Sequence, residues 1–305
     1  MDLNLNLSSS IKLGVHTLSN RIVMSSMTCL SEEHDLSYSE TLDYYVNRAS
    51  AGLIVTEPAL ISPLADFSNC PGIYCYQQVK SWRKITEAVH DRNGKIFLQL
   101  WYCGDLATPC LLGKVLTTKT WLPNAKQVKS NSSNKRQISA IVRLFRCAAQ
   151  NALAADFDGV EIHAAFGYLI ESNFSNKLKP IQELEQRMEL LNSIIEEVAS
   201  IWDEQRVGIR ISPEAAFLGE NVTDIYEAFS CFFDIFEFYN LGYVHLVEPN
   251  IAHNHCDVFA ALISFLRSVY HGSIISSCHN SFEQAQKVIA RGNADLVSFD
   301  RLIAC

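Results

Sequence analysis

Residues 95–101 read KIFLQLW, and residues 157–163 read FDGVEIH. Each is a short apolar run with β-branched or aromatic residues, which is typical of a buried strand. Between them, residues 139–155 carry apolar side chains at helical spacing. A strand, a helix and a second strand in this order predict a βαβ unit with parallel strands.

The same alternation extends outward from this unit in both directions along the chain. A sequence of eight strands, each but the last followed by a helix, closes most simply into a (β/α)8 TIM barrel of the α/β class. No Pro/Gly-rich linker interrupts it, so residues 1–305 are expected to form a single domain. The predicted strands are Arg21–Met27, Leu53–Ile61, Lys95–Trp101, Gly159–His163, Arg206–Ser212, Gly242–Glu248, Ser273–Ser277 and Asp295–Phe299. The predicted helices are Ser39–Ser50, Gln78–Arg92, Ser139–Ala155, Leu184–Ile201, Thr223–Tyr239, Asp257–Tyr270 and Ser281–Arg291.

Composition limits the class of partner. The chain is 48% hydrophobic with a net charge of −8, which argues against binding to nucleic acid or to an anionic membrane. No run approaches the roughly 18 apolar residues of a membrane span, and no secretory signal is visible. The 10 cysteines are scattered and match no zinc-binding spacing, so no metal is predicted and reduced thiols in the cytoplasm are expected.

The C-terminal end of the sequence departs from the regular pattern. It stops at Cys305, directly after the eighth predicted strand, where a further helix is expected. The apolar outer surface near that strand must then be covered by something else or stay exposed. A second copy of the chain or another partner at this edge is one expectation.

Polar residues follow the strands at the end where β/α barrels place their active sites. Side chains of this kind that meet at one barrel mouth would bind a flat small-molecule ligand with hydrogen-bonding edges. The candidates are Ser26, Met27, Thr28, Gln99, Trp101, Tyr102, His163, Phe166, Tyr168, Arg210 and Arg301.

These strand ends carry a family resemblance. The segments SNRIVMSSMT (19–28), KIFLQLW (95–101), FDGVEIH (157–163) and GIRISP (208–213) occur in order and resemble the Old Yellow Enzyme family. That family consists of FMN-dependent reductases that take hydride from NAD(P)H and deliver it to an activated C=C bond. The resemblance implies the same barrel, FMN as cofactor and NAD(P)H as hydride donor.

The resemblance also implies roles for individual residues. Thr28, with the neighbouring Ser26 and Met27, and Gln99 would contact the flavin ring, and Arg210 would stabilise negative charge on the reduced ring. Arg301 would bind the flavin phosphate. His163 would donate to an oxygen of the substrate, and Tyr168 would protonate the adjacent carbon. Trp101, Tyr102 and Phe166 would line the substrate pocket.

Several positions depart from the family pattern. Phe166 stands where the family has a second donor to the substrate oxygen, and Tyr102 replaces a histidine. Cys278 and His279 replace a Gly-Gly turn that lets backbone N–H groups approach the phosphate. Asp300 places a carboxylate where the family has the glycine of a Gly-Arg pair. A weakened FMN site is therefore expected.

Three functions remain open from the sequence. The first is an NAD(P)H-dependent, FMN-containing ene-reductase. The second is a pseudoenzyme of the same barrel family that has lost its flavin and binds a ligand or a protein. The third is a redox-neutral isomerase that uses His163 and Tyr168 for acid/base chemistry. Bound flavin distinguishes the first from the second, and consumption of NAD(P)H distinguishes the first from the third.

Overall fold

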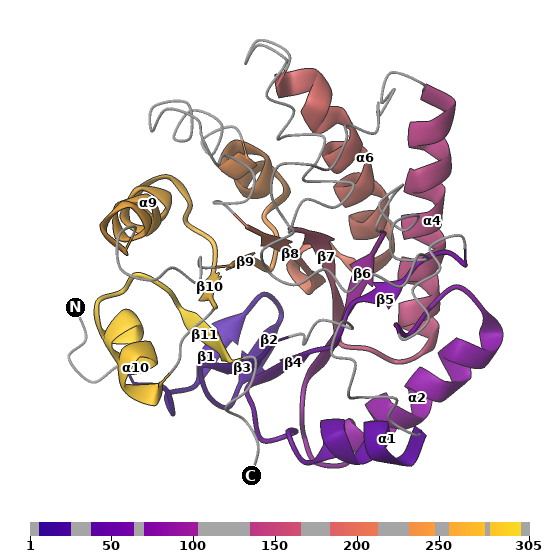
Figure 1. Ribbon diagram of the computed structural model, residues 1–305, viewed down its shortest axis with the longest axis horizontal. Coiled ribbons are helices and arrows are strands. Elements are labelled where there is room, and N and C mark those ends of the chain that lie inside the picture. The colour runs from indigo at the N-terminus through magenta and orange to yellow at the C-terminus, as the bar shows by residue number, and fades with distance from the viewer. Residues whose placement is uncertain are drawn as a thin grey trace, which may run out of the picture.

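A closed barrel of parallel strands lies at the centre of the structure (Figure 1). The computed structural model describes residues 6–25, 38–63, 70–102, 135–165, 184–212, 232–247, 256–277 and 281–299. The sheet runs in the order β4-β3-β11-β10-β9-β8-β7-β6-β5, and a further pairing of β4 with β6 closes it. The predicted (β/α)8 barrel is thus confirmed. Its strands are β3 (Ile22–Met24), β4 (Leu53–Val55), β5 (Ala59–Leu60), β6 (Ile96–Trp101), β7 (Gly159–Ala164), β8 (Val207–Ile211), β9 (Tyr243–Leu246), β10 (Ile274–Ser276) and β11 (Leu296–Phe299).

The second predicted strand is interrupted in the structure. Leu53–Ile61 was expected to be continuous, but it forms β4 and β5 with residues 56–58 between them. Both pieces pair with β6, so together they fill one place in the barrel. Pro58 lies in the interruption, and proline has no N–H to donate to a neighbouring strand.

Helices surround the barrel (Figure 1). Ser281 caps one of them, since its Oγ accepts a hydrogen bond from the backbone N–H of Gln284 at 3.2 Å. The predicted helix Thr223–Tyr239 is described only over residues 232–239, which are helical. The others are α1 (Tyr38–Val46), α2 (Tyr76–His90), α4 (Lys135–Ala154), α6 (Leu184–Trp202), the 3-10 turn η3 (Glu204–Arg206), α9 (Cys256–Val269) and α10 (Phe282–Ala290).

Aromatic side chains that pack over glycines fill the N-terminal half of the barrel interior. The Phe97 ring lies over Gly159, and the Tyr243 ring lies over Gly208. A Cβ added at Gly208 would come within 2.2 Å of the Tyr243 ring. Because the two rings also contact each other, with centroids 5.9 Å apart, this layer is closed by aromatic packing.

A hairpin that the sequence analysis did not predict closes the N-terminal end of the barrel. It consists of β1 (Ile11–Leu13) and β2 (His16–Leu18), which pair antiparallel. Leu13 and Leu18 are buried in one cluster with inward-facing barrel residues such as Phe97. Strands of three residues are too short for an alternation pattern to identify them.

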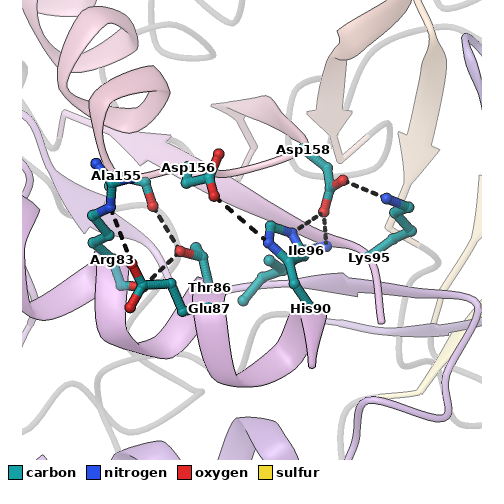
Figure 2. A network of polar contacts seen from close by, with 9 residues as sticks. All are labelled: Arg83, Thr86, Glu87, His90, Lys95, Ile96, Ala155, Asp156 and Asp158. Carbon is teal, nitrogen blue, oxygen red and sulfur yellow. Dashed lines mark hydrogen bonds and ion pairs between the residues drawn. The ribbon is translucent and has the colours of Figure 1, made fainter. Parts of the chain in front are cut away.

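A polar network around Asp158 lies at the same end of the barrel (Figure 2). Its carboxylate accepts hydrogen bonds from Lys95 Nζ at 2.7 Å, His90 Nε2 at 2.9 Å and the backbone N–H of Ile96 at 3.0 Å. His16 of the hairpin donates to the backbone oxygen of Asp158 at 3.0 Å. The network therefore joins α2, β6, the start of β7 and the hairpin.

The outer face of the eighth strand position, β11, is covered within the described residues. Val297 and Phe299 are buried against Ala285 and Ile289 of α10 and against Leu7. The ring of Phe282, half exposed, lies 4.9 Å from that of Phe299. Residues 300–305 lie outside the described ranges, so the expectation for the chain after this strand stays a prediction. No helix in the described ranges is long and apolar enough to cross a membrane.

Candidate active site

Three of the predicted site residues meet inside the C-terminal half of the barrel. Gln99, His163 and Arg210 come from the adjacent strands β6, β7 and β8, and all three are buried. They face inward because their neighbours in the chain, such as Ile162 and Ile209, belong to the outer core beneath the helices. In the strand register, His163 lies opposite Arg210.

Trp101 ends β6 on the same inner face. Its ring centroid lies 6.1 Å from that of His163, and its side chain is buried. Tyr102, the next residue, is partly buried and packs against the outer hydrophobic core. The structure thus places Trp101, but not Tyr102, beside His163.

The remaining candidates lie outside the described residues. Some of them end or follow the first predicted strand and are predicted to contact the flavin ring. Others follow the fourth predicted strand and are predicted to line the pocket or donate a proton, and the rest form the predicted phosphate site. Their roles stay predictions. They are Ser26, Met27, Thr28, Phe166, Tyr168, Cys278, His279, Asp300 and Arg301.

The environment of His163 removes its positive charge. Burial, reinforced by the nearby guanidinium of Arg210, lowers the pKa of His163 from 6.5 to about 3. A neutral imidazole has one N–H donor and one acceptor nitrogen. At neutral pH His163 can therefore donate a single hydrogen bond to a ligand at the barrel mouth without carrying charge there.

A buried acid without a predicted role lies one layer below His163. Glu161 is fully buried, and its Oε1 accepts a hydrogen bond from Gln99 Nε2 at 2.5 Å. Its Oε2 lies 2.9 Å from His245 Nδ1, and His245 Nε2 lies 2.9 Å from Ser298 Oγ. The signal that could have revealed Glu161 is a charged residue at an inward position of a strand that is otherwise apolar.

Glu161 is ionised at neutral pH. Burial raises the pKa of this carboxyl. The contacts with His245, the charge of Arg210 and the hydrogen bond from Gln99 together lower the pKa by a larger amount, so the net shift is downward. The interior of the barrel thus holds a carboxylate and a guanidinium within one set of neighbouring strands.

Thr56 fixes the strand that carries Gln99. Its Oγ1 accepts a hydrogen bond from the backbone N–H of Gln99 at 3.1 Å and donates to the backbone oxygen of Glu57 at 2.9 Å. The hydroxyl thus links β6 to the chain that leaves β4. No group of three or more His, Cys, Asp or Glu side chains within the described ranges could hold a metal ion.

Comparison with known proteins gives consistent matches over nearly the whole chain. The profile of the NADH:flavin oxidoreductase / NADH oxidase family matches residues 6–304. A putative 12-oxophytodienoate reductase 2 from Oryza sativa subsp. japonica is 32% identical, over 95% of this chain and 82% of the relative. A putative 12-oxophytodienoate reductase-like protein 1 from Arabidopsis thaliana is 31% identical, over 93% of each chain.

Solved structures agree with these sequence matches. The old yellow enzyme from Trypanosoma cruzi superposes with a TM-score of 0.78 at 28% identity, over 97% of this chain and 88% of that one. Morphinone reductase in complex with tetrahydroNAD superposes with a TM-score of 0.77 at 27% identity, over 98% and 87%.

Proposed function

The chain belongs to the NADH:flavin oxidoreductase / NADH oxidase family, as its resemblance to the Old Yellow Enzyme family predicts, and we propose that it is an FMN-dependent reductase of activated C=C bonds. NAD(P)H is the proposed hydride donor. The observation that carries the proposal is the buried cluster of Gln99, His163 and Arg210 on three adjacent strands at the barrel mouth. The reductases among its relatives support it.

The donor set of this cluster fits a flavin ring. An amide and a guanidinium pair with the carbonyl oxygens and ring nitrogens of a flat heterocycle, and the neutral imidazole beside them can donate to an oxygen of a substrate that lies against the ring. The Ser25 hydroxyl, fully buried at the end of β3, makes no hydrogen bond within the described ranges and adds a polar group on the same side. FMN, when bound, would supply the hydride chemistry.

The side chains of this chain would bind and orient the reactants. Gln99 would hold the ring edge, and the fixed charge of Arg210 would stabilise negative charge on the ring. His163 would donate its single N–H to the oxygen of an enone, where charge develops as hydride is transferred. Thr28, Arg301 and Tyr168 are proposed, by resemblance, to contact the ring, bind the phosphate and protonate the substrate carbon. The replacements Cys278, His279 and Asp300 support a weaker hold on the phosphate.

A visible spectrum of the purified protein, recorded with and without added FMN, tests the proposal directly. Flavin absorption that bleaches anaerobically with NADPH or NADH, and returns when cyclohex-2-enone is added, is the expected result. A colourless protein that retains no FMN would refute the reductase and leave the flavin-free barrel. Flavin that binds but is not bleached would favour redox-neutral chemistry.

The variant His163→Gln separates binding from turnover. Because His163 is assigned to the substrate rather than to the flavin, the variant is expected to keep its flavin absorption. Enone-driven reoxidation is expected to fall about 100-fold, the loss typical of one missing donor to a developing oxyanion. His90→Gln, a histidine substitution at the opposite end of the barrel, is the matched control and should leave both properties unchanged.

A further inference from the structure

We propose that Glu161 is a positioning residue for the flavin: held by His245 and Ser298, it fixes the Gln99 amide and places a buried anion one layer below the site. This inference rests on the proposed function and extends it to three residues that have no predicted role. The chain of contacts crosses the barrel interior from β6 through β7 and β9 to β11.

The Gln99 amide has one orientation in this cluster. An ionised carboxylate only accepts hydrogen bonds, so the nitrogen of the amide, and not its oxygen, must face Glu161 Oε1. The amide oxygen then lies on the opposite side of the group. An amide that could rotate by 180° would present either its nitrogen or its oxygen to a ligand, whereas the Gln99 amide presents its oxygen. Because an oxygen accepts hydrogen bonds, it pairs with a ligand edge that donates an N–H.

Glu161 is itself held by two further side chains. Its other oxygen accepts from His245 Nδ1 at 2.9 Å, and the far side of that imidazole contacts Ser298 Oγ at 2.9 Å. Glu161, His245 and Ser298 are all fully buried. Because these side chains are fully buried on strands of one closed sheet and are linked by hydrogen bonds, the carboxylate has little freedom to move.

Glu161 also acts through its charge. Charges interact more strongly in the barrel interior than in water, so the Glu161 carboxylate acts on any charge gained by a ring bound above it. A nearby anion disfavours the added negative charge of the reduced ring, whereas Arg210 favours it. Glu161 and Arg210 therefore set the midpoint potential of the bound flavin in opposite directions.

The test compares wild-type protein with Glu161→Gln by titrating riboflavin and FMN and following flavin fluorescence. Riboflavin lacks the phosphate, so it reports on the ring alone. Loss of the amide orientation is expected to weaken the binding of both flavins by the same factor, on the order of tenfold, as for the loss of one hydrogen bond between neutral groups. The midpoint potential of the bound FMN is expected to become more positive because an anion has been removed.

The matched control is Asp158→Asn, which makes the same carboxylate-to-amide change at a buried residue of the opposite barrel end. It should lower stability without changing the affinity for either flavin or the potential. Ser298→Ala is a milder second variant, because it removes only the far contact of His245. It should lower the affinity for both flavins, as Glu161→Gln does, but by a smaller factor.

The outcomes separate this inference from the function on which it rests. Suppose that wild-type protein binds flavin. If Glu161→Gln then leaves both affinities unchanged, or lowers the affinity for FMN but not for riboflavin, the inference is wrong and the proposed reductase function is unaffected. If Glu161→Gln does not fold, unchanged affinity in Ser298→Ala overturns the inference. A wild-type protein that binds neither flavin overturns both.

Discussion

His163 shows how a single residue couples the candidate site to stability. The site requires a neutral donor, and burial near Arg210 provides it by lowering the pKa of His163 to about 3. In the unfolded chain the same side chain has its ordinary pKa, near 6.5. Protonation between these two values therefore favours unfolding.

We expect the free energy of unfolding to be independent of His163 above pH 6.5 and to fall as the pH is lowered from there toward 3. One proton taken up only by the unfolded chain contributes a slope of about 1.4 kcal/mol per pH unit. His163→Asn should therefore flatten the pH dependence of urea unfolding between pH 6 and 4.5 by about that amount. His16, whose pKa burial also lowers, accounts for part of the remaining slope.

His271→Asn is the control for this measurement, because the His271 side chain is 80% exposed. An equal flattening of the pH dependence in both variants would show that His163 takes up its proton in the folded protein as well as in the unfolded chain. It would then argue against a neutral His163 in the folded site.

The residues of the site divide according to what the sequence can reveal. Gln99, His163 and Arg210 could be predicted because each lies near the C-terminal end of a predicted strand, where β/α barrels place their active sites, and because the family resemblance implies a role for each. Glu161, His245 and Ser298 could not be assigned in the same way. Their contacts cross the barrel interior between strands that are 53 and 84 residues apart in sequence.

At the scale of elements, the hairpin of β1 and β2 shows what the periodicity of the sequence cannot convey. The long helices and the buried strands have enough residues for a pattern, and their positions were predicted. The hairpin depends on the packing of its turn against η3. Gly14 in this turn has a φ of 55°, and a Cβ there would lie 1.9 Å from the backbone oxygen of Gln205.

Gly14→Ala is expected to be strongly destabilising, by about 3 kcal/mol, because the left-handed backbone and the clash with Gln205 act together. Gly292→Ala is the matched control. Its φ is 73°, but a Cβ there meets nothing within 4 Å, so only the backbone strain remains, about 1 kcal/mol. Chemical denaturation of the two variants measures the difference. Equal losses would show that the hairpin turn yields to make room.

At the scale of the whole molecule, the two ends of the barrel carry different kinds of polar group. The C-terminal half of the interior holds the candidate site, and the N-terminal end holds the Asp158 network. This network joins α2 and β6 (Figure 2), and His16 connects it to the hairpin. Between them lies the aromatic layer of Phe97 and Tyr243. This division is typical of β/α barrels, in which function gathers at one face and stability at the other.

Asp158→Asn tests that division. The Asp158 side chain is only 9% exposed and pairs with Lys95, so loss of its charge leaves a buried network incomplete and should cost about 3 kcal/mol of unfolding free energy. Because the pKa of Asp158 is lowered by Lys95, the Ile96 amide and His90 despite burial, this contribution is present above pH 3.8 and is lost as the pH falls below it.

Asp156→Asn isolates the effect of burial from that of charge. Asp156 lies 3.9 Å from His90, but its side chain is 60% exposed, and an exposed pair contributes under about 1 kcal/mol. Its φ of 63° is one that asparagine tolerates well, so no backbone strain is added. Urea unfolding should thus distinguish the two variants clearly while riboflavin binds both as it binds the wild type. A loss of riboflavin affinity in Asp158→Asn would mean that the aromatic layer transmits changes from one end of the barrel to the other.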